Sequence, residues 1–114
     1  MLSAELRRRL LKFRTERDWE QFHTPKTLSI ALCVEAAELL EHFQWIADNE
    51  VQDKVRNRGA DIAHEVADLA ILLTYLVDDL GLDLENAVKE KLALNEQKYP
   101  IDKSRGIAKK YTDL

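Results

Sequence analysis

Apolar residues recur every three or four positions along most of the chain, which is the period of an amphipathic helix. Near the N-terminal end, Leu6, Leu10 and Phe13 have this spacing, with Arg and Lys side chains on the other side. The pattern predicts a first helix over about residues 3–20. Short polar interruptions divide the rest of the chain into further helices.

A second helix is expected from Thr24 to about residue 47. Thr24 is a favourable N-cap, and Pro25 suits the first helical position because its missing N–H needs no partner there. The polar stretch 48–58, which Gly59 follows, is typical of a loop or a short frayed turn. The sequence therefore predicts that the second helix ends before this loop.

A third and a fourth helix complete the pattern. The third keeps a helical period of apolar residues up to Gly81, and glycine is the commonest residue just beyond a helix C-terminus. Asp83 can cap the fourth helix, and Pro100 ends it. Residues 98–114 then form a basic C-terminal tail.

These elements predict an all-α fold in a single domain over residues 1–114. The chain has three Gly and two Pro, too few for the many tight turns of a sandwich or barrel of short strands. Short connections between helices are typical of antiparallel bundles. Because the apolar faces of the second and third helices are wider than one partner helix needs, we expect a bundle of about four helices that is completed by oligomerisation.

Composition and charge exclude several classes of protein. The formal net charge is -4 and the pI about 5.4, opposite to the basic surface that binds a nucleic-acid polymer. No segment reaches the roughly 18 consecutive apolar residues of a membrane span, and the N-terminus lacks a signal-peptide pattern. The single Cys33 can form no internal disulfide, which fits a reducing compartment. We therefore expect a cytoplasmic protein without nucleic-acid or membrane partners.

Two pairs of carboxylates lie where a helix normally presents apolar side chains. Glu35 falls within the apolar stripe of the second helix, and Glu38 follows three residues later. Glu65 and Asp68 repeat this spacing in the third helix. Side chains three residues apart are neighbours on a helix. Packing the two helices together therefore gathers four like charges, at a large desolvation cost unless a cation neutralises them.

A divalent cation is the simplest neutraliser of this acidic cluster. Oxygen ligands without Cys or a pair of His favour Mg²⁺, with Mn²⁺ as an alternative, over Zn²⁺. Both ions also bind phosphate oxygens, so the predicted metal indicates a phosphorylated substrate. One Glu-x-x-Glu pair alone more often belongs to a solvated face, but two pairs inside apolar stripes are harder to explain in that way.

Two other interpretations account for part of the pattern. A di-iron carboxylate bundle needs an acid followed three positions later by a His on each of two helices, and only Asp61 and His64 have that spacing. A non-catalytic helical interaction module with an acidic face explains the charge. It does not explain why the carboxylates share positions with core residues. The sequence favours a metal-dependent enzyme with a phosphorylated substrate over both alternatives.

Several longer motifs carry a resemblance to a known family. They are Glu16-Arg17-Asp18-Trp19-Glu20-Gln21-Phe22-His23, Glu35-x-x-Glu38, Phe43-Gln44-Trp45, Glu65-x-x-Asp68, Asn95-x-x-Lys98-Tyr99-Pro100, Ser104-Arg105-Gly106 and Lys110-Tyr111-Thr112-Asp113-Leu114. Together they closely resemble the MazG-like all-α nucleoside triphosphate pyrophosphohydrolases, and within that family the dCTP pyrophosphatase branch. The resemblance extends from about the first helix to the last residue.

The resemblance implies Mg²⁺-dependent cleavage between the α and β phosphates of a nucleoside triphosphate, which releases the monophosphate and pyrophosphate. The implied substrate is dCTP or a related deoxynucleotide, and the implied purpose is the removal of unwanted nucleotides. Members of the family form dimers and tetramers. By position, the implied metal ligands are Glu35, Glu38, Glu65 and Asp68. We expect Glu38 to accept the proton of the attacking water as well.

The resemblance also implies residues around the nucleoside. They are Trp19, Glu20, Gln21, Phe22, His23 and Trp45. Indole rings can enclose a base and an imidazole can hydrogen-bond it, although each also has an ordinary role in a core or a loop. His42 is interpreted as a core or interface residue and not as part of the site.

One face of the fourth helix suits contacts to phosphate oxygens. It carries Lys91, Asn95 and Lys98, which a solvated face would also explain. Leu10 and Leu72 stand where the dCTP branch has a His and a Tyr near the nucleoside. The sequence therefore supports the type of reaction better than it supports the base.

Overall fold

The computed structural model describes residues 2–114, and these residues form helices without any strand. The all-α prediction is confirmed. Along the chain the elements are α1 (Ala4–Glu16), the 3-10 helix η1 (Glu20–Phe22), α2 (Pro25–Glu41), the 3-10 helix η2 (Asp48–Glu50), α3 (Val51–Asp79), α4 (Leu84–Lys98), α5 (Ile101–Ser104) and the 3-10 helix η3 (Tyr111–Asp113). They fall into two compact units, one ending at Gly81 and one over Leu82–Leu114. The expectation of a single domain stays a prediction.

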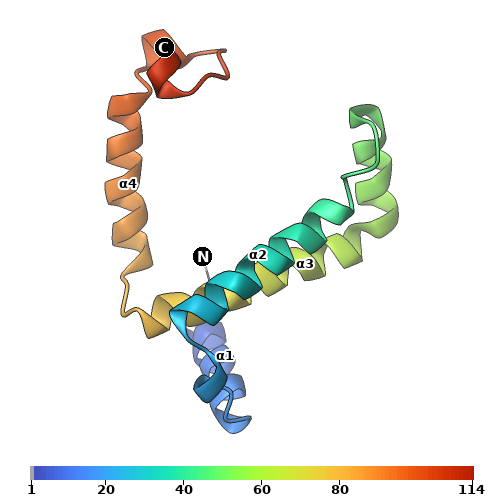
Figure 1. Cartoon of the computed structure of the whole chain (residues 1–114), viewed down its shortest axis with the longest axis vertical. Helices are drawn as coiled ribbons and strands as arrows, with labels where there is room; N and C mark the ends of the chain where they lie inside the picture. The colour runs from blue at the N-terminus through green and yellow to red at the C-terminus, as the bar shows by residue number, and fades with distance from the viewer. Residues whose placement is uncertain (1) are drawn as a thin grey trace. The chain divides into compact units, whose positions relative to one another are not determined.

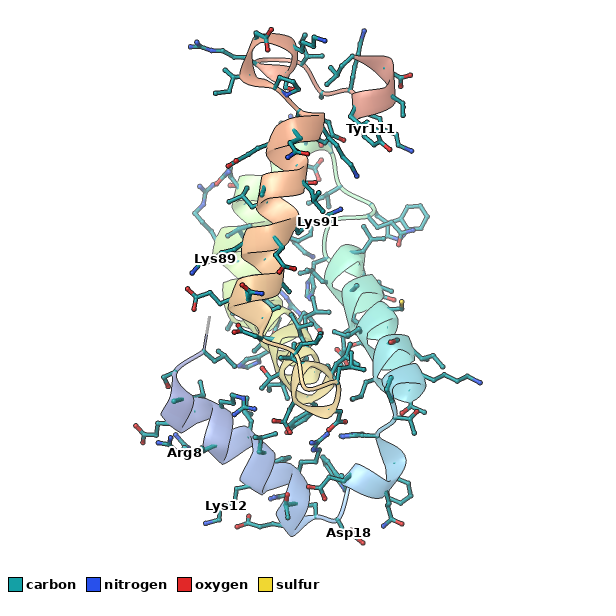
Figure 2. The ribbon with its side chains drawn as sticks, turned by 90° about the vertical axis from the view of Figure 1, so that its left-hand side faces the viewer. Arg8, Lys12, Asp18, Lys89, Lys91 and Tyr111 are labelled. Atoms are coloured by element: carbon teal, nitrogen blue, oxygen red, sulfur yellow. The ribbon has the colours of Figure 1, made fainter. Side chains whose placement is uncertain are left out.

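Helix α1 begins as predicted but ends earlier, at Glu16 instead of about residue 20. Its N-cap is Ser3, whose Oγ accepts a hydrogen bond from the backbone N–H of Leu6 at 3.1 Å. Two residues after its last turn, Asp18 has a φ of 52°, a left-handed conformation that stops a right-handed helix. The chain therefore turns at Asp18 (Figure 2) and continues as η1.

Helix α2 also begins where the sequence predicted and ends short of the prediction, at Glu41 instead of about residue 47. Thr24 forms a capping box with Thr27: the hydroxyl of each side chain accepts the backbone N–H of the other residue. Beyond the helix the backbone tightens, and the N–H of Ile46 reaches back only to the carbonyl of Phe43. The apolar pattern continues through this segment, but the chain has to reverse there before α3 can pack on α2.

The prediction of a loop over residues 48–58 is wrong, because this stretch contains η2 and the first turns of α3. Polar residues suit an exposed helical turn as well as a loop, and here two ion pairs join residues three apart, Arg56 with Asp53 and Arg58 with Asp61. The predicted break survives only as a kink at Arg58, where φ is -126° and ψ is 24°. Figure 1 shows the first turns of α3 bending away from the rest of the helix.

Helices α2 and α3 lie side by side as an antiparallel hairpin (Figure 1). The hairpin buries little: among the described residues, Leu28 and Tyr75 are the only apolar side chains classed as buried, at 1% and 3% exposed. Helix α1 packs against α3, and three ion pairs join them. Arg7 pairs with Asp78, and Arg14 pairs with Asp79 at 2.9 Å and with Asp78 at 3.8 Å. The end of α3 is thus the point at which three helices meet.

Gly81 ends this first unit with a φ of 63°, in agreement with the predicted helix stop. In the second unit, the side chain of Asp83 caps α4 by accepting the N–H of Asn86 at 3.0 Å. The segment after α4 is folded: the ring of Tyr111 (Figure 2) lies 6.0 Å from that of Tyr99 and 4.9 Å from the ammonium of Lys98. Across the described part of the chain, no helix is long and apolar enough to cross a membrane.

We predict that Leu28→Ala lowers the free energy of unfolding by about 3 kcal/mol, because it leaves a cavity at the most buried side chain of the hairpin. Chemical denaturation followed by circular dichroism measures the loss. The exposed Lys26, two residues nearer the start of α2, provides the control, and Lys26→Ala should change stability by no more than about 0.5 kcal/mol. Equal effects of the two substitutions would contradict the assigned core.

Candidate functional site

Three carboxylates meet between α2 and α3. Glu35 and Glu38 come from α2 and Glu65 from α3, and one oxygen from each lies within 4.8 Å of the other two. Their meeting follows from the local structure, since residues three apart on α2 project as neighbours and the hairpin brings α3 against them. The cluster is half-buried at Glu35 and Glu65 and exposed at Glu38.

Glu35 is the strained member of this cluster. Burial raises the pKa of its carboxyl above the ordinary value, and the negative charge of Glu38 raises it further, followed by those of Asp68 and Glu65. One of its oxygens, Oε2, is buried with no hydrogen-bond partner. A buried polar atom without a partner costs free energy unless something positive reaches it.

The residues of the cluster fit a divalent cation. They offer only carboxylate oxygens, the ligand type of hard cations such as Mg²⁺ and Mn²⁺. They also include one buried oxygen that no protein group satisfies. A cation between the helices would supply the missing partner and offset the mutual repulsion that raises the pKa of Glu35.

Asp68 lies next to this cluster but outside its three-oxygen core. Its charge is one of the causes of the raised pKa of Glu35, and both side chains line the same cavity. The structure therefore brings together all four residues that the sequence proposed as ligands, with three in direct proximity. Ligation of a metal by any of the four stays a prediction.

His42, which the sequence analysis set aside, borders the same cluster. Its Nε2 lies 3.8 Å from Oε1 of Glu65, and His42 is the C-cap of α2. The signal was present in the sequence, because His42 follows Glu35 by two helical turns and Glu38 by one. A protonated imidazole there would offset part of the charge of Glu65.

A cavity of about 310 Å³ adjoins the carboxylates. It is lined by Phe13, Trp19, His23, Glu35, Asp68, Ile71, Leu72 and Tyr75. Two acids thus stand at a pocket whose other walls are mainly aromatic and aliphatic, at the small end of the range for ligand pockets. Such a pocket combines a polar, metal-binding side with an apolar side for a flat ring.

The aromatic walls of the cavity are held by specific contacts. The rings of Phe13 and Trp19 meet edge to face, with centroids 5.6 Å apart. Phe13 carries the guanidinium of Arg17 on its ring at 3.7 Å. The imidazole of His23 lies 5.5 Å from the ring of Tyr75. These aromatic contacts set the width of the apolar side.

The proposed nucleoside-binding residues divide into two groups. Trp19 and His23 flank η1 in sequence and line the cavity. Four others are not among its lining residues: Glu20, Gln21, Phe22 and Trp45. Glu20 pairs with Thr15 and Gln21 with Asp18, while Phe22 and Trp45 are 65% and 86% exposed. Their contact with a nucleoside stays a prediction.

The cavity also contains residues that the sequence analysis did not assign to the site. Phe13 was interpreted as part of an apolar stripe in the first helix. Ile71, Leu72 and Tyr75 follow Asp68 by three, four and seven positions, so they share its face of α3. That spacing was the signal that could have found them, and it places Leu72 on the wall of the cavity.

Lys91, Asn95 and Lys98 all lie on α4, where Figure 2 labels Lys91. They belong to the second unit, so their contact with phosphate stays a prediction.

The di-iron alternative gains no support in the first unit. There the exposed Asp61 pairs with Arg58, and His64 is exposed and outside the carboxylate cluster.

Comparison with known proteins gives the family. The MazG-like family model matches residues 30–114. The chain is 43% identical over 113 residues to dCTP pyrophosphatase 1 of Mus musculus and 40% identical to that of Homo sapiens, and each match covers 96% of this chain but 66% of the relative. The structure resembles that of a pyrophosphatase from Archaeoglobus fulgidus DSM 4304, with a TM-score of 0.81 and 40% identity over 84% of this chain and 90% of that one. These matches confirm the resemblance noted from the motifs, and the chain belongs to the MazG-like family.

Proposed function

We propose that the chain is a metal-dependent nucleoside triphosphate pyrophosphohydrolase. Water would cleave the bond between the α and β phosphates, so that one triphosphate and one water give a monophosphate and pyrophosphate. The observation that carries this proposal is the position of Glu35, which belongs both to the carboxylate cluster and to the lining of the adjoining cavity. A cation on the cluster and a nucleoside in the cavity would place the phosphates between them.

The relatives support a deoxynucleotide as the substrate. Two of them are named dCTP pyrophosphatase 1, and the solved structure is described as a pyrophosphatase. We therefore propose dCTP or a related deoxynucleoside triphosphate as the substrate, and the removal of unwanted nucleotides as the purpose. Leu72 lies on the cavity wall, where its apolar side chain offers a base no hydrogen bond. It therefore affects which base is preferred.

Mg²⁺ is the proposed cofactor, with Mn²⁺ as the alternative, and Glu35, Glu38, Glu65 and Asp68 as the residues that would hold it. When bound, the cation neutralises phosphate charge and lowers the pKa of water. The ligand chemistry supports this choice, because all four side chains are carboxylates. The raised pKa of Glu35 supports it as well, since it reflects first the burial of the carboxyl and then the negative charge of the neighbouring acids, both of which a cation would offset.

Within the cluster, Glu38 is the proposed general base. It is the exposed member of the three, so it is the one that water reaches most easily. Glu35 is less suited to this role, because burial and the neighbouring acids raise the pKa of its carboxyl. Glu38 would take the proton of the attacking water while the bond to pyrophosphate breaks.

Lys91, Asn95 and Lys98 are the proposed phosphate contacts. They are four and three positions apart on α4, so their side chains share one face of the helix. Two ammonium groups and one amide on one face match the charge and hydrogen-bonding needs of a triphosphate.

A homo-oligomer, a dimer or a tetramer, is the proposed assembly. One side of α2 packs on α3, yet Ile30, Val34 and Leu40 remain 51–56% exposed on that helix. Ser29, Ile30, Cys33, Val34 and Ala37 line a shallow, almost wholly apolar groove along its outer face. A helix that is apolar nearly all round is normally buried, and a second hairpin packed on α2 would complete a four-helix bundle.

The proposed compartment is the cytoplasm, where the exposed thiol of Cys33 stays reduced.

The first prediction concerns the reaction itself. Incubation with Mg²⁺ and a deoxynucleoside triphosphate should give monophosphate and pyrophosphate, separated by ion-exchange chromatography from diphosphate and phosphate. Glu38→Gln should lower kcat by about 100-fold or more while the circular dichroism spectrum stays unchanged. Glu41→Gln, at an exposed carboxylate on the same helix, should keep full activity. Diphosphate as the product would refute the assigned cleavage.

The second prediction concerns metal and pH. The pKa of Glu35 lies above 4.5 in the folded protein, so from about pH 4.5 upward the folded state binds more protons than the unfolded state. Stability of the metal-free protein should therefore fall as the pH rises through that window. Glu35→Gln removes the titrating charge, so its Tm should exceed the wild-type value at pH 7.5 without metal.

Millimolar Mg²⁺ or Mn²⁺ should bring the Tm of the wild-type protein above that of Glu35→Gln. It should raise the Tm of the wild-type protein at pH 7.5, because it binds the folded state, and leave that of Glu35→Gln nearly unchanged. Thermal unfolding from pH 4.5 to 8 with and without metal provides the measurement, with Glu41→Gln as the control. If the Tm of the wild-type protein is the same with and without the metal, that result would count against the proposed cation site.

The third prediction concerns assembly. Light scattering at micromolar concentration should give a mass of at least twice 13.2 kDa, and Val34→Glu should shift it towards the monomer by placing a charge in the apolar groove. Val88→Glu changes a similarly exposed valine on α4 and should leave the mass unchanged. A monomeric wild-type protein would refute the proposal.

A further inference from the structure

Arg14 is the most deeply buried charged side chain among the described residues, at 3% exposed. Its Nη1 and Nη2 donate to Oδ2 and Oδ1 of Asp79 at 3.0 and 2.9 Å, in a two-pronged ion pair from α1 to the end of α3. The planar guanidinium is therefore fixed in orientation and not only in position. Its Nε is buried without a partner.

The fixed guanidinium bears on the wall of the cavity. Its central carbon lies 4.7 Å from the centre of the Tyr75 ring. The hydroxyl of Tyr75 donates to the backbone carbonyl of Leu10 at 3.1 Å. The ring of Tyr75 is thus held by α1 at two points, and its cavity side lies beside the imidazole of His23. Arg14 itself does not line the cavity.

The backbone of Arg14 holds a second lining residue of the cavity, Trp19. Its carbonyl accepts the backbone N–H of Trp19 at 3.1 Å, which fixes the turn that presents the indole to the cavity. One residue thus connects Trp19, Tyr75 and, through Tyr75, His23. Two aromatic residues that line the cavity, Trp19 and Tyr75, are thus both held by contacts with Arg14.

A clamp between two helices does not by itself need a buried arginine. Arg7 and Asp78 already join α1 to α3 with both side chains partly exposed, which avoids most of the cost of removing charge from water. Arg14 makes the same kind of link, but its side chain is buried and lies against the ring of Tyr75, which lines the cavity. The burial of Arg14 is therefore explained by its contact with the cavity wall and not by the need to link α1 to α3.

We propose that Arg14 is a positioning residue for the nucleoside: through Tyr75, His23 and Trp19 it sets the spacing of the walls that receive a planar heteroaromatic base. The inference rests on the proposed function and assigns a part of the site that the carboxylates do not explain. The local charges agree with it. Burial lowers the pKa of His23, and the charge of Arg14 lowers it further, against Asp79 and Glu20, which raise it. A neutral imidazole therefore faces the base.

The test compares Arg14→Lys with Arg7→Lys, which make the same substitution in two ion pairs between the same helices. Lysine keeps the charge but loses the planar fork and the flat face on Tyr75. Arg14→Lys should raise KM for dCTP about fivefold with kcat within twofold, and should weaken the binding of deoxycytidine monophosphate by a similar factor in calorimetry. Arg7→Lys should change neither quantity.

Asp79→Asn provides a second approach from a partly exposed partner. It removes the charge of the two-pronged partner, so that Asp78, at 3.8 Å, is the one carboxylate left beside the guanidinium. Every cavity residue stays in place, and this variant too should raise KM and spare kcat. The proposal is overturned if either folded variant binds the monophosphate as the wild type does, or if kcat falls as much as kcat/KM. Failure of the wild type to release pyrophosphate would refute the proposed function alone, because monophosphate binding still tests Arg14.

Discussion

Two helices that pack along their length must leave no unbalanced charge between them, and α2 and α3 depart from this rule at Glu35. Its carboxylate is half-buried, its Oε2 has no partner, and three further acids surround it. Replacing such a group by an apolar residue is often neutral or stabilising. The carboxylate cluster is therefore a cost to the packing of α2 on α3, which a cation between the helices would offset.

The other half of the site depends on a different joint. Helix α1 touches α3 near its end, where Arg14 and Asp79 pair, and this contact places Phe13 and Trp19 opposite Ile71, Leu72 and Tyr75 in the cavity. The acidic end of the site is thus made by α2 and α3, and the aromatic end by α1, the two residues that flank η1, and α3. Glu35 and Asp68 stand where the two ends meet.

Much of this could be predicted from the sequence where a single helix carries the information. Periodicity gave the helices, Thr24 and Asp83 gave two of their caps, and the spacing of Glu35 with Glu38 gave the acidic face. Residues 48–58 failed because a polar stretch with pairs such as Arg56 and Asp53 serves an exposed helix equally well. The complete cavity could not be predicted, because Phe13 lines it together with Tyr75 only after α1 has docked on α3.

The two joints differ in how far apart their partners lie along the chain. The hairpin unites neighbouring segments, whereas Arg14 and Asp79 are 65 positions apart. Closing a short loop costs less entropy and takes less time than bringing distant segments together. We therefore expect the hairpin with its carboxylates to form first during folding, and α1 to dock afterwards. No side chain of the carboxylate cluster comes from α1, whereas the cavity needs Phe13 from that helix. Partial unfolding at α1 would therefore open the cavity and leave the cluster in place.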